Sequence, residues 1–566
     1  MFVRAARRSG SRSYATSSPL FDGKVADVCS PFPPISTSYD VPVPEFVSKD
    51  WGSPELSSKV AIRDGSTGEV RTFGDYSRHM TNTANALKTE FGLGSEHTAA
   101  IYSLNNVDYL PISLAVGQLG AKISPINPLS TVSEMTRILV PSNSKILFTH
   151  AKLLPVALEA VKEAPCVEHV VVIPDAEADT KLEGVVQLED LLAFNSSDER
   201  DVGSDHVEHV NKHPWLLPYS SGTTGLPKGV MLTHGNMLAN LLQLEAVEKE
   251  SFPRHESLIS PLPFFHIYGL MASLLYCGWQ GQTLITTSAR FDLANFCALV
   301  SEHRPSRAHL VPPIILGLSK HPLVDDYDMT SLEWIVSAAA PLGEEAEKAA
   351  EARLGTRVKQ AWGMSELSPL GTFNHDADPR GVGPLVSSTE GKVIDPVTGE
   401  SLGPNESGEL CIRGPQVMAG YLNNEEKTNE CLSDGGWLRT GDLAHYTDDG
   451  YFYITDRIKE LIKVRGFPVA PAELEDLLLT NEDVQDSAVV QVPDEASGEL
   501  PRAYVVLKPT ADPAEVTEDV LKDWVKERVS PYKRLHSVKF VEQIPKSASG
   551  KILRRLLRDE VKEEFA

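Results

Sequence analysis

Cysteine is scarce in this 566-residue chain, which has six, scattered along it without a CxxC pair or a histidine-rich neighbourhood. This spacing excludes a disulfide framework, so we expect reduced and mostly structural thiols. Basic residues are also fewer than acidic ones. The chain has 53 Lys and Arg and 78 Asp and Glu, which gives a formal net charge of −25 at pH 7. That charge argues against a nucleic-acid partner. An anionic ligand would have to be met by local basic groups.

Long apolar runs are missing as well. The longest, LPISLAVGQLGA at 110–121, is too short to span a bilayer and is followed by Lys122. We therefore expect no transmembrane segment and predict a buried core helix at this place. The apolar share of 41% and the charged share of 23% are ordinary for a globular protein.

The first residues differ from the rest of the chain. MFVRAARRSGSRSYATSS contains four arginines and several serines, and no acidic residue precedes Asp22. This composition is typical of a mitochondrial or plastid transit peptide, and RSYA resembles a mitochondrial processing site that is cut after Tyr14. We predict a transit peptide at 1–20 and a mitochondrial location. The alternative is a basic tail on a cytoplasmic protein.

Short β-branched runs alternate with helical stretches through most of the chain, which predicts an α/β fold. Examples of predicted strands are 99–104 (AAIYSL), 145–150 (KILFTH) and 169–174 (HVVVIP). Near the end an aromatic strand, YFYIT, is followed by DRIKELIKVRGFPVAPAELEDLLL, with a turn at Gly466 and a helix opened by Pro471. We place a large N-terminal domain at 21–455 and a small α+β domain at 456–566.

Residues Tyr219–His234 read YSSGTTGLPKGVMLTH, between an apolar strand candidate (WLLPY) and a predicted helix (MLTHGNMLANLLQL). A glycine and hydroxyl loop between a strand and a helix can wrap phosphate groups with its N–H groups. It is not the P-loop of kinases and ATPases, because Gly222 is followed by Pro227 and Gly229 where that motif needs glycine and Ser or Thr. Lys228 still supplies a positive charge.

SSGTTGLPKG resembles the signature of the adenylate-forming superfamily of acyl-CoA synthetases, luciferases and peptide-synthetase adenylation domains. Further motifs of that superfamily follow in order from about residue 210 to the end of the chain. They are PLPFFHIYG, SAAAPLG, QAWGMSE, GELCIRGPQVMAGYLNN, GWLRTGD, DRIKELIKVRGFPVAPAELE and PKSASGKILRR. The similarity is greatest to the 4-coumarate:CoA ligase and related acyl-CoA ligase branch.

The resemblance implies an ATP-dependent carboxylic acid:CoA ligase. The acid and ATP give an acyl adenylate and pyrophosphate, and CoA then displaces AMP. ATP, Mg²⁺ and CoA are the implied cofactors and co-substrates, and the implied partners are small molecules only. The implied fold has a large N-terminal domain of α/β sheets with a small β-barrel, and a smaller mobile C-terminal domain that rotates between the two half-reactions.

The resemblance also assigns roles to residues that would handle the phosphates of ATP. Glu366 resembles the carboxylate that holds Mg²⁺, and Ser365 the residue that touches the α-phosphate. Lys551 resembles the lysine that bridges the acid and the α-phosphate, and His266 the histidine between the carboxylate and the thiol tunnel. The residues that resemble the loop around the β- and γ-phosphates are Ser220, Ser221, Gly222, Thr223, Thr224, Gly225 and Lys228.

The remaining assignments concern the nucleoside, the acid, CoA and the hinge. Asp442 resembles the ribose-binding carboxylate and Arg457 its companion. The other residues with an implied role are Gln360 and Ala361 at the adenine, Lys459 and Lys463 near AMP, Tyr268, Ala272 and Ala339 in the acyl pocket, Arg465, Gly466 and Arg290 at CoA, and Asp456 to Lys459 at the hinge.

This chain departs from the coumarate ligases in the acyl pocket. Those enzymes generally read SGAAPLG and QGYGMTE, whereas this chain has SAAAPLG and QAWGMSE. Ala361 adds a methyl group, Trp362 replaces a tyrosine, and Ala272 stands where a serine is common. An aryl acid and a medium- or long-chain fatty acid both remain open, because one methyl group changes pocket preference by only about 1–3 kcal/mol.

Two other functions and two oligomeric states also remain open. The adenylate could pass to a carrier protein or be oxidised as in luciferases, or the chain could be a non-catalytic nucleotide-binding scaffold. Dependence of turnover on CoA separates the first alternative from a ligase, and the absence of pyrophosphate release would identify the second. Monomer and homodimer are both compatible with the sequence.

The leader gives a test that needs no enzyme assay. Fusion of residues 1–30 to a fluorescent protein should direct it to mitochondria, because the segment is rich in Arg and Ser and poor in acids. The matched control replaces its arginines by glutamine and should remain in the cytosol. A diffuse signal from the unchanged leader would contradict the import hypothesis.

Overall fold

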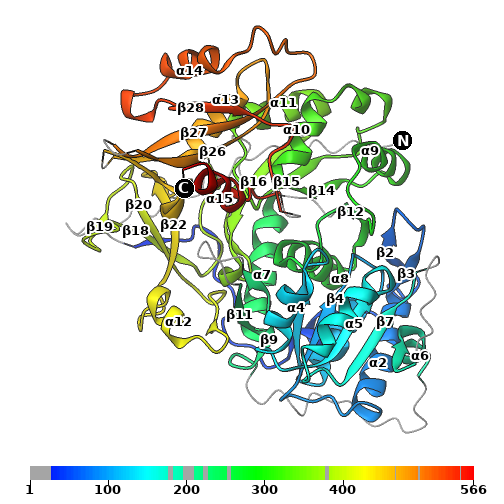
Figure 1. Cartoon of the computed structure of the whole chain (residues 1–566). Helices are drawn as coiled ribbons and strands as arrows, with labels where there is room; N and C mark the ends of the chain where they lie inside the picture. Colours follow the sequence, from blue (N-terminus) through cyan, green and yellow to red (C-terminus); the bar gives the residue numbers. More distant parts are fainter. Residues whose placement is uncertain are drawn as a thin grey trace, which may run out of the picture.

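The computed structural model describes residues 27–175, 183–194, 210–220, 227–251, 257–375, 381–465, 467–494, 497–547 and 550–565 (Figure 1). Within these ranges no helix combines the length and the apolar character needed to cross a membrane. The six cysteines are all free.

The first sheet has nine strands, and its central part is parallel. Their order is β10–β11–β9–β5–β4–β6–β7–β8, with β21 beside β11. Strands β4 to β7 are almost fully buried, which explains their near-continuous apolar sequences. The bounds are β4 (Thr98–Tyr102), β5 (Lys122–Ile126), β6 (Ser144–His150), β7 (His169–Ile173), β8 (Val185–Gln187), β9 (Pro214–Leu216), β10 (Tyr219–Ser220), β11 (Lys228–Thr233) and β21 (Gly420–Tyr421). The predicted strands at 99–104, 145–150 and 169–174 are confirmed.

The second sheet has eight strands in the order β17–β16–β15–β14–β12–β13–β2–β3. Strands β16 to β2 run parallel, and both terminal pairs are antiparallel. The bounds are β2 (Val60–Asp64), β3 (Val70–Thr72), β12 (Ser257–Ile259), β13 (Thr283–Thr286), β14 (Arg307–Leu310), β15 (Trp334–Ser337), β16 (Arg357–Gly363) and β17 (Leu370–Phe373).

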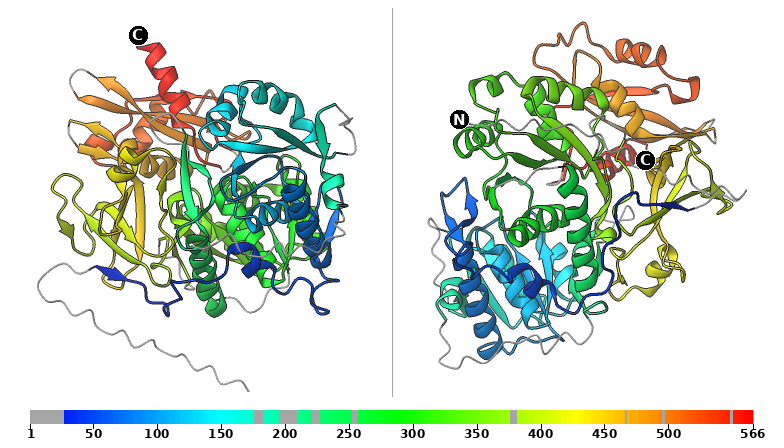
Figure 2. Two further views of the ribbon diagram at one scale, coloured as in Figure 1. Left: turned by 90° about the horizontal axis from the view of Figure 1, so that it is seen from below. Right: turned by 180° about the vertical axis from the view of Figure 1, so that it is seen from behind.

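Helices pack against these two sheets, as expected for parallel strands joined by crossovers (Figures 1 and 2). The predicted core helix is α3, in which every residue from Tyr109 to Gly117 is buried. The helical elements are α1 (Val43–Ser48), α2 (Phe73–Thr89), α3 (Tyr109–Gln118), α4 (Val132–Leu139), η1 (Ala151–Leu153), α5 (Leu154–Lys162), α6 (Leu188–Leu192), α7 (His234–Ser251), η2 (Tyr268–Leu275), α8 (Tyr276–Gln280), α9 (Leu293–His303), α10 (Pro312–Lys320), η3 (Pro322–Asp326), α11 (Glu344–Leu354) and η4 (Ser365–Leu367).

The third sheet is antiparallel and stands where a small β-barrel was expected. Its order is β1–β18–β20–β22–β23, with β19 beside β18, so the hydrogen bonds of the described residues form an open path. The helix α12 (Glu425–Cys431) precedes β22. The strands are β1 (Val28–Cys29), β18 (Glu390–Ile394), β19 (Ser401–Leu402), β20 (Gly408–Arg413), β22 (Leu438–Tyr446) and β23 (Phe452–Arg457).

The C-terminal domain has its own five-stranded sheet and its own buried core. In Figures 1 and 2 its strands, drawn in orange, lie at one end of the large domain. The switch from β23 to this sheet falls between Arg457 and Ile462, close to the predicted boundary at 456. The elements are η5 (Ile458–Glu460), β24 (Ile462–Val464), β25 (Phe467–Val469), α13 (Pro471–Leu479), β26 (Val484–Asp494), β27 (Gly498–Leu507), α14 (Glu518–Lys526), η6 (Pro531–Lys533), β28 (Ser537–Phe540) and α15 (Arg554–Glu564).

One local prediction is wrong. The helix after the glycine and hydroxyl loop was expected to begin at Met231, but residues up to Thr233 belong to β11. The reason is tertiary pairing, because β11 lies between β9 and β21 and buries its aliphatic side chains there. The helix then begins at His234, where Thr233 Oγ1 accepts a hydrogen bond of 3.0 Å from the N–H of Asn236.

Candidate functional site

A cleft of about 1460 Å³ lies between the large domain and the C-terminal domain. Its lining comes from all four sheets and from the loops at their edges. Trp362 and Asp442 line it from the large domain, and Lys551 and Glu475 line it from the C-terminal domain. The cleft therefore brings together residues that are far apart in the sequence.

The strands on either side of the glycine and hydroxyl loop line this cleft and are antiparallel. Ser220 of β10 pairs with Lys228 of β11, and both line the cleft. The ammonium of Lys228 lies 4.1 Å from the centre of the Tyr421 ring, in the geometry of a cation–π contact. The other predicted loop residues lie outside the described residues: Ser221, Gly222, Thr223, Thr224 and Gly225.

Glu366, the predicted metal ligand, is a buried carboxylate in η4 with only 5% of its surface exposed. Its Oε1 accepts a hydrogen bond of 2.8 Å from the Tyr421 hydroxyl, and its backbone oxygen accepts one of 2.9 Å from Met418 N–H. Burial and the charge of Glu366 raise the pKa of Tyr421, so its hydroxyl stays a donor. Ser365 and Lys228 line the same cleft.

Asp442, the predicted ribose ligand, is held from two directions. Its Oδ2 accepts a hydrogen bond of 2.9 Å from the indole Nε1 of Trp362, and its Oδ1 lies 3.4 Å from Nε of Arg457. Arg457 is its direct partner across the β22–β23 ladder. Burial raises the pKa of Asp442, while Arg457 and the indole oppose that shift. Trp362, which stands where the coumarate ligases generally have tyrosine, thus donates a hydrogen bond to the carboxylate.

Lys551 reaches the cleft from a turn of the C-terminal domain. Its N–H donates to Ser547 Oγ at 3.1 Å, and its carbonyl accepts from Ser547 N–H at 2.8 Å. The preceding Gly550 has φ +78°, and a Cβ there would lie 3.3 Å from Pro313, so the turn rests on α10 of the large domain. Only a residue tolerant of a left-handed backbone fits this close approach.

The electrostatics show which groups share the site with Lys551. Burial and Arg457 lower the pKa of Lys551 to about 8, against the attraction of Asp442 and Glu366. Burial and the charge of Lys551 lower the pKa of His266 to about 3, so this imidazole is neutral. Its Nδ1 accepts from Tyr268 N–H at 3.3 Å, which leaves the Nε2–H as the donor. Ammonium, imidazole and two carboxylates therefore face one volume.

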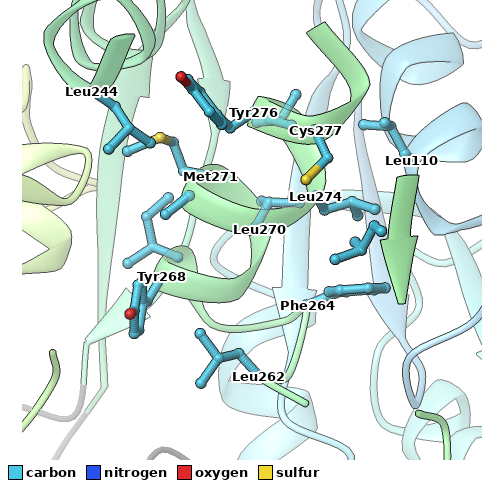
Figure 3. Packing of buried hydrophobic residues seen from close by; sticks show 14 of the residues in the cluster. Leu110, Leu244, Leu262, Phe264, Tyr268, Leu270, Met271, Leu274, Tyr276 and Cys277 are labelled. Atoms are coloured by element: carbon cyan, nitrogen blue, oxygen red, sulfur yellow. The ribbon is translucent and has the colours of Figure 1, made fainter. Parts of the chain in front are cut away.

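The acyl-pocket residues lie on and around the π-helical segment η2. Figure 3 shows Tyr268 and Met271 on one side of this segment, with Leu244 beside Met271, and Phe264 and Leu110 on the other. The Tyr268 hydroxyl donates to the Val336 carbonyl at 3.1 Å. The predicted residues Ala272 and Ala339 line the cleft as well. Ala339 has φ +75°, a conformation that L-residues rarely adopt.

The hinge residues lie where the two domains meet. Asp456 is buried and accepts hydrogen bonds from the N–H groups of Arg457 at 2.7 Å and Ala472 at 2.8 Å. It therefore links the end of β23 to the first turn of α13. Lys459 lines the cleft, and its charge acts on Glu430 of α12.

Three predicted ligand residues are not brought to the cleft. Lys463, Arg465 and Arg290 are exposed and do not belong to its lining. Lys463 and Arg465 are on and just after β24, which is turned away from the site in this arrangement of the domains. Lys463 was predicted near AMP and the two arginines at CoA; Gly466, the third residue predicted at CoA, lies outside the described residues.

The structure adds residues that the sequence did not single out. Tyr421 carries the hydroxyl that holds Glu366, and its signal was its place in the motif GELCIRGPQVMAGYLNN. His309 lines the cleft behind Tyr268, with ring centres 5.8 Å apart. Glu347 of α11 lines it beside Gln360. Neither His309 nor Glu347 lies in a recognisable motif.

Comparison with known proteins agrees with this geometry. The AMP-binding enzyme family matches residues 53–422, and the AMP-binding enzyme C-terminal domain matches residues 473–551. The chain belongs to the AMP-binding enzyme family. The predicted superfamily and the predicted fold, with a large and a small domain, are confirmed by these matches.

Curated relatives of this AMP-binding enzyme extend over nearly its whole length. It is 39% identical over 542 residues to 4-coumarate--CoA ligase-like 1 of Arabidopsis thaliana. This match covers 94% of this chain and 96% of the relative. It is 37% identical to 4-coumarate:CoA ligase 1 of Petunia hybrida, over 89% of this chain and 91% of the relative. The predicted enzyme class, an acid–thiol ligase, agrees with these relatives.

Solved structures of other proteins have the same overall fold. ATP-bound MatB from Rhodopseudomonas palustris superposes on this AMP-binding enzyme with a TM-score of 0.80 at 26% identity, covering 93% of this chain and 100% of that one. The anthranilate CoA ligase AuaEII has a TM-score of 0.83 at 24% identity, over 93% and 98% of the two chains. This second likeness supports the fold alone.

The lowered pKa of Lys551 predicts a pH dependence for this AMP-binding enzyme. A lysine with a pKa of about 8 is a cation below that pH and loses its charge above it. The kcat/KM for ATP in pyrophosphate release should therefore fall as pH rises through about 8, since this parameter reports groups of the free enzyme. Lys551→Arg keeps its charge and should remove this limb of the profile. If the limb persisted in the arginine variant, another group would be responsible.

Proposed function

We propose that the protein is an ATP-dependent carboxylic acid:CoA ligase that acts on an aryl acid. The observation that carries this proposal is the meeting of Lys551 with Asp442, Glu366 and His266 in one cleft. An ammonium group among carboxylates and a neutral imidazole suits a reaction in which two anions, a carboxylate and a triphosphate, must come together. The similarity to 4-coumarate–CoA ligases favours the same activity.

In the first half-reaction a carboxylate oxygen of the acid forms a bond to the α-phosphorus of ATP, and the bond to pyrophosphate breaks. The Lys551 ammonium donates to the acid oxygen and to the α-phosphate, and Lys228 balances charge on the departing pyrophosphate. Asp442 accepts hydrogen bonds from the ribose hydroxyls, for which a two-oxygen acceptor is suited. The His266 imidazole donates to the acid from the other side. These groups are fixed before the reaction, so little reorganisation is needed.

We propose Mg²⁺ as the metal, bound by Glu366 together with phosphate oxygens of ATP. A single carboxylate fits this ion, which is commonly held by one or two carboxylates plus substrate phosphates. In the described residues no group of three or more His, Cys, Asp or Glu could hold a metal by itself. Once bound, the ion neutralises phosphate charge. The Tyr421 hydroxyl keeps Oε1 of Glu366 in place for this role.

In the second half-reaction the CoA thiol attacks the acyl carbon and AMP leaves. The exposed residues Lys463 and Arg465 reach the site in this proposal by rotation of the C-terminal domain about Asp456 to Lys459. The same rotation withdraws Lys551, whose charge is needed only for adenylation. Domain rotations of this kind are an established way to run two steps in one site.

An aryl acid is favoured over a fatty acid by the rings that line the acyl pocket. The Tyr268 ring lies over His309 at an angle of 23°, which gives the pocket a flat and stiff wall. Ala272 and Ala361 are small and leave room for a ring beside that wall. For the cellular location we propose mitochondria, on the composition of the leader alone.

The two half-reactions give a mutational test. Lys551→Ala should lower acid-dependent pyrophosphate release by about 10²-fold or more, because it removes one preorganised cation. Thiolysis of preformed acyl adenylate by CoA should change little. The control Lys546→Ala removes a neighbouring lysine that pairs with Asp486 at 2.6 Å within the C-terminal domain. Equal losses in both half-reactions would contradict the assigned role.

The substrate class is tested by pyrophosphate release with Mg-ATP and a panel of aryl and short- to long-chain acids, with and without CoA. Turnover that requires CoA and an aryl acid is the expected result, since the pocket wall is aromatic. Turnover that prefers a fatty acid would overturn the aryl assignment. Adenylation that ignores CoA would indicate another acceptor, and no release with any acid would indicate a scaffold.

A further inference from the structure

The side-chain amide of Gln360 has both of its hydrogens engaged within the protein. Its Nε2 lies 2.6 Å from Oε2 of Glu347 and 3.1 Å from the carbonyl oxygen of Leu342. A carbonyl oxygen can only accept, so the atom that faces it must be the amide nitrogen. This assigns the orientation of the amide and leaves its Oε1 as the group available to a ligand.

Gln360 points toward the nucleotide side of the cleft. It lies on β16 two residues before Trp362, and side chains two apart on a strand share one face of the sheet. Trp362 donates to Asp442, so this face is the one that carries the ribose-binding carboxylate. Both Gln360 and Trp362 line the cleft. Gln360 therefore lies on the same face of β16 as Trp362 and lines the cleft that contains Asp442.

Glu347 is the unusual member of this arrangement. Only 1% of its surface is exposed, and its Oε1 has no hydrogen-bond partner among the described residues. Burial raises the pKa of its carboxyl group to about 7, against the hydrogen bond from Gln360. Burying a carboxyl group in this way costs free energy, and α11 contains other acids that are exposed instead. Among the described residues, the Gln360 amide is the side chain that donates a hydrogen bond to the Glu347 carboxyl group.

We propose that Glu347 is a positioning residue that selects the nucleotide base by fixing the orientation of the Gln360 amide. With the amide hydrogens held by Glu347 and Leu342, Gln360 Oε1 can accept from a 6-amino group, as in adenine. It cannot donate to a 6-oxo group, as in hypoxanthine or guanine. The inference rests on the proposed function, because it takes Gln360 to face the base of ATP.

The test is the preference for ATP over inosine triphosphate, which replaces the 6-amino group by an oxygen. Kinetics of acid-dependent pyrophosphate release would be measured for the wild type, Glu347→Ala, Glu347→Gln and the control Glu345→Ala. Glu345 is an exposed acid of the same helix. The wild type and the control should prefer ATP strongly.

Glu347→Ala leaves only the 3.1 Å bond to the Leu342 carbonyl to hold the Gln360 amide, so turning its nitrogen toward a 6-oxo group costs one hydrogen bond instead of two. The ratio of kcat/KM for ATP to that for inosine triphosphate should fall about tenfold, the scale of one hydrogen bond made or lost. The change should be in KM, with kcat at saturating ATP nearly unchanged, because base binding is equal in the ground and transition states. Glu347→Gln still offers an acceptor to Gln360 Nε2 and should restore the ratio.

Two results would overturn the inference. One is an unchanged ratio in Glu347→Ala with a loss of kcat, which indicates a merely structural role. The other is a wild type that does not discriminate between the two nucleotides. If Glu347→Ala does not fold, a glutamine variant with a ratio far below that of the wild type would equally contradict the proposal. If the proposed function itself were wrong, the wild type would release no pyrophosphate with ATP and any acid. That result differs from a failure of the inference about Glu347.

Discussion

The carboxylate of Asp442 is buried, and the cleft is organised around the donors and cations that hold its charge. The indole of Trp362 comes from the second sheet, the guanidinium of Arg457 from the neighbouring strand, and the ammonium of Lys551 from the C-terminal domain. A buried carboxylate without such partners would take up a proton. The indole and the guanidinium contact this carboxylate directly, and the Lys551 ammonium adds an electrostatic attraction from the C-terminal domain.

The other charged groups of the cleft follow the same principle. Glu366 is held by a hydroxyl and Asp456 by two backbone N–H groups, so each buried acid has a partner that fixes it before any ligand binds. At Glu347 the effect of burial outweighs the attraction of Lys359, and the pKa rises to about 7. The pKa of a buried carboxyl group in this cleft therefore depends on its neighbours as well as on its residue type.

Much of this could be predicted from the sequence, because the signals were local. Buried parallel strands have continuous apolar sequences, and the motif residues from Ser220 to Lys551 carried their roles by resemblance. Residues without a local signal could not be found. Glu347 is one acid among several in EEAEKAAEARL, and only the fold puts it beside Gln360. The segment from Met231 to Thr233 was read as helix because its pairing with β9 and β21 is not visible in the sequence.

The left-handed backbone of Ala339 has a consequence for how this pocket can change. An alanine at φ +75° costs on the order of 1–2 kcal/mol relative to a relaxed backbone. Its neighbours must hold it there, so the wall of the acyl pocket is stiff at the expense of stability. A glycine at this position would relieve the cost and loosen the wall. Stability and substrate discrimination are thereby opposed at a single residue, whose backbone carries the strain and whose methyl group lines the pocket.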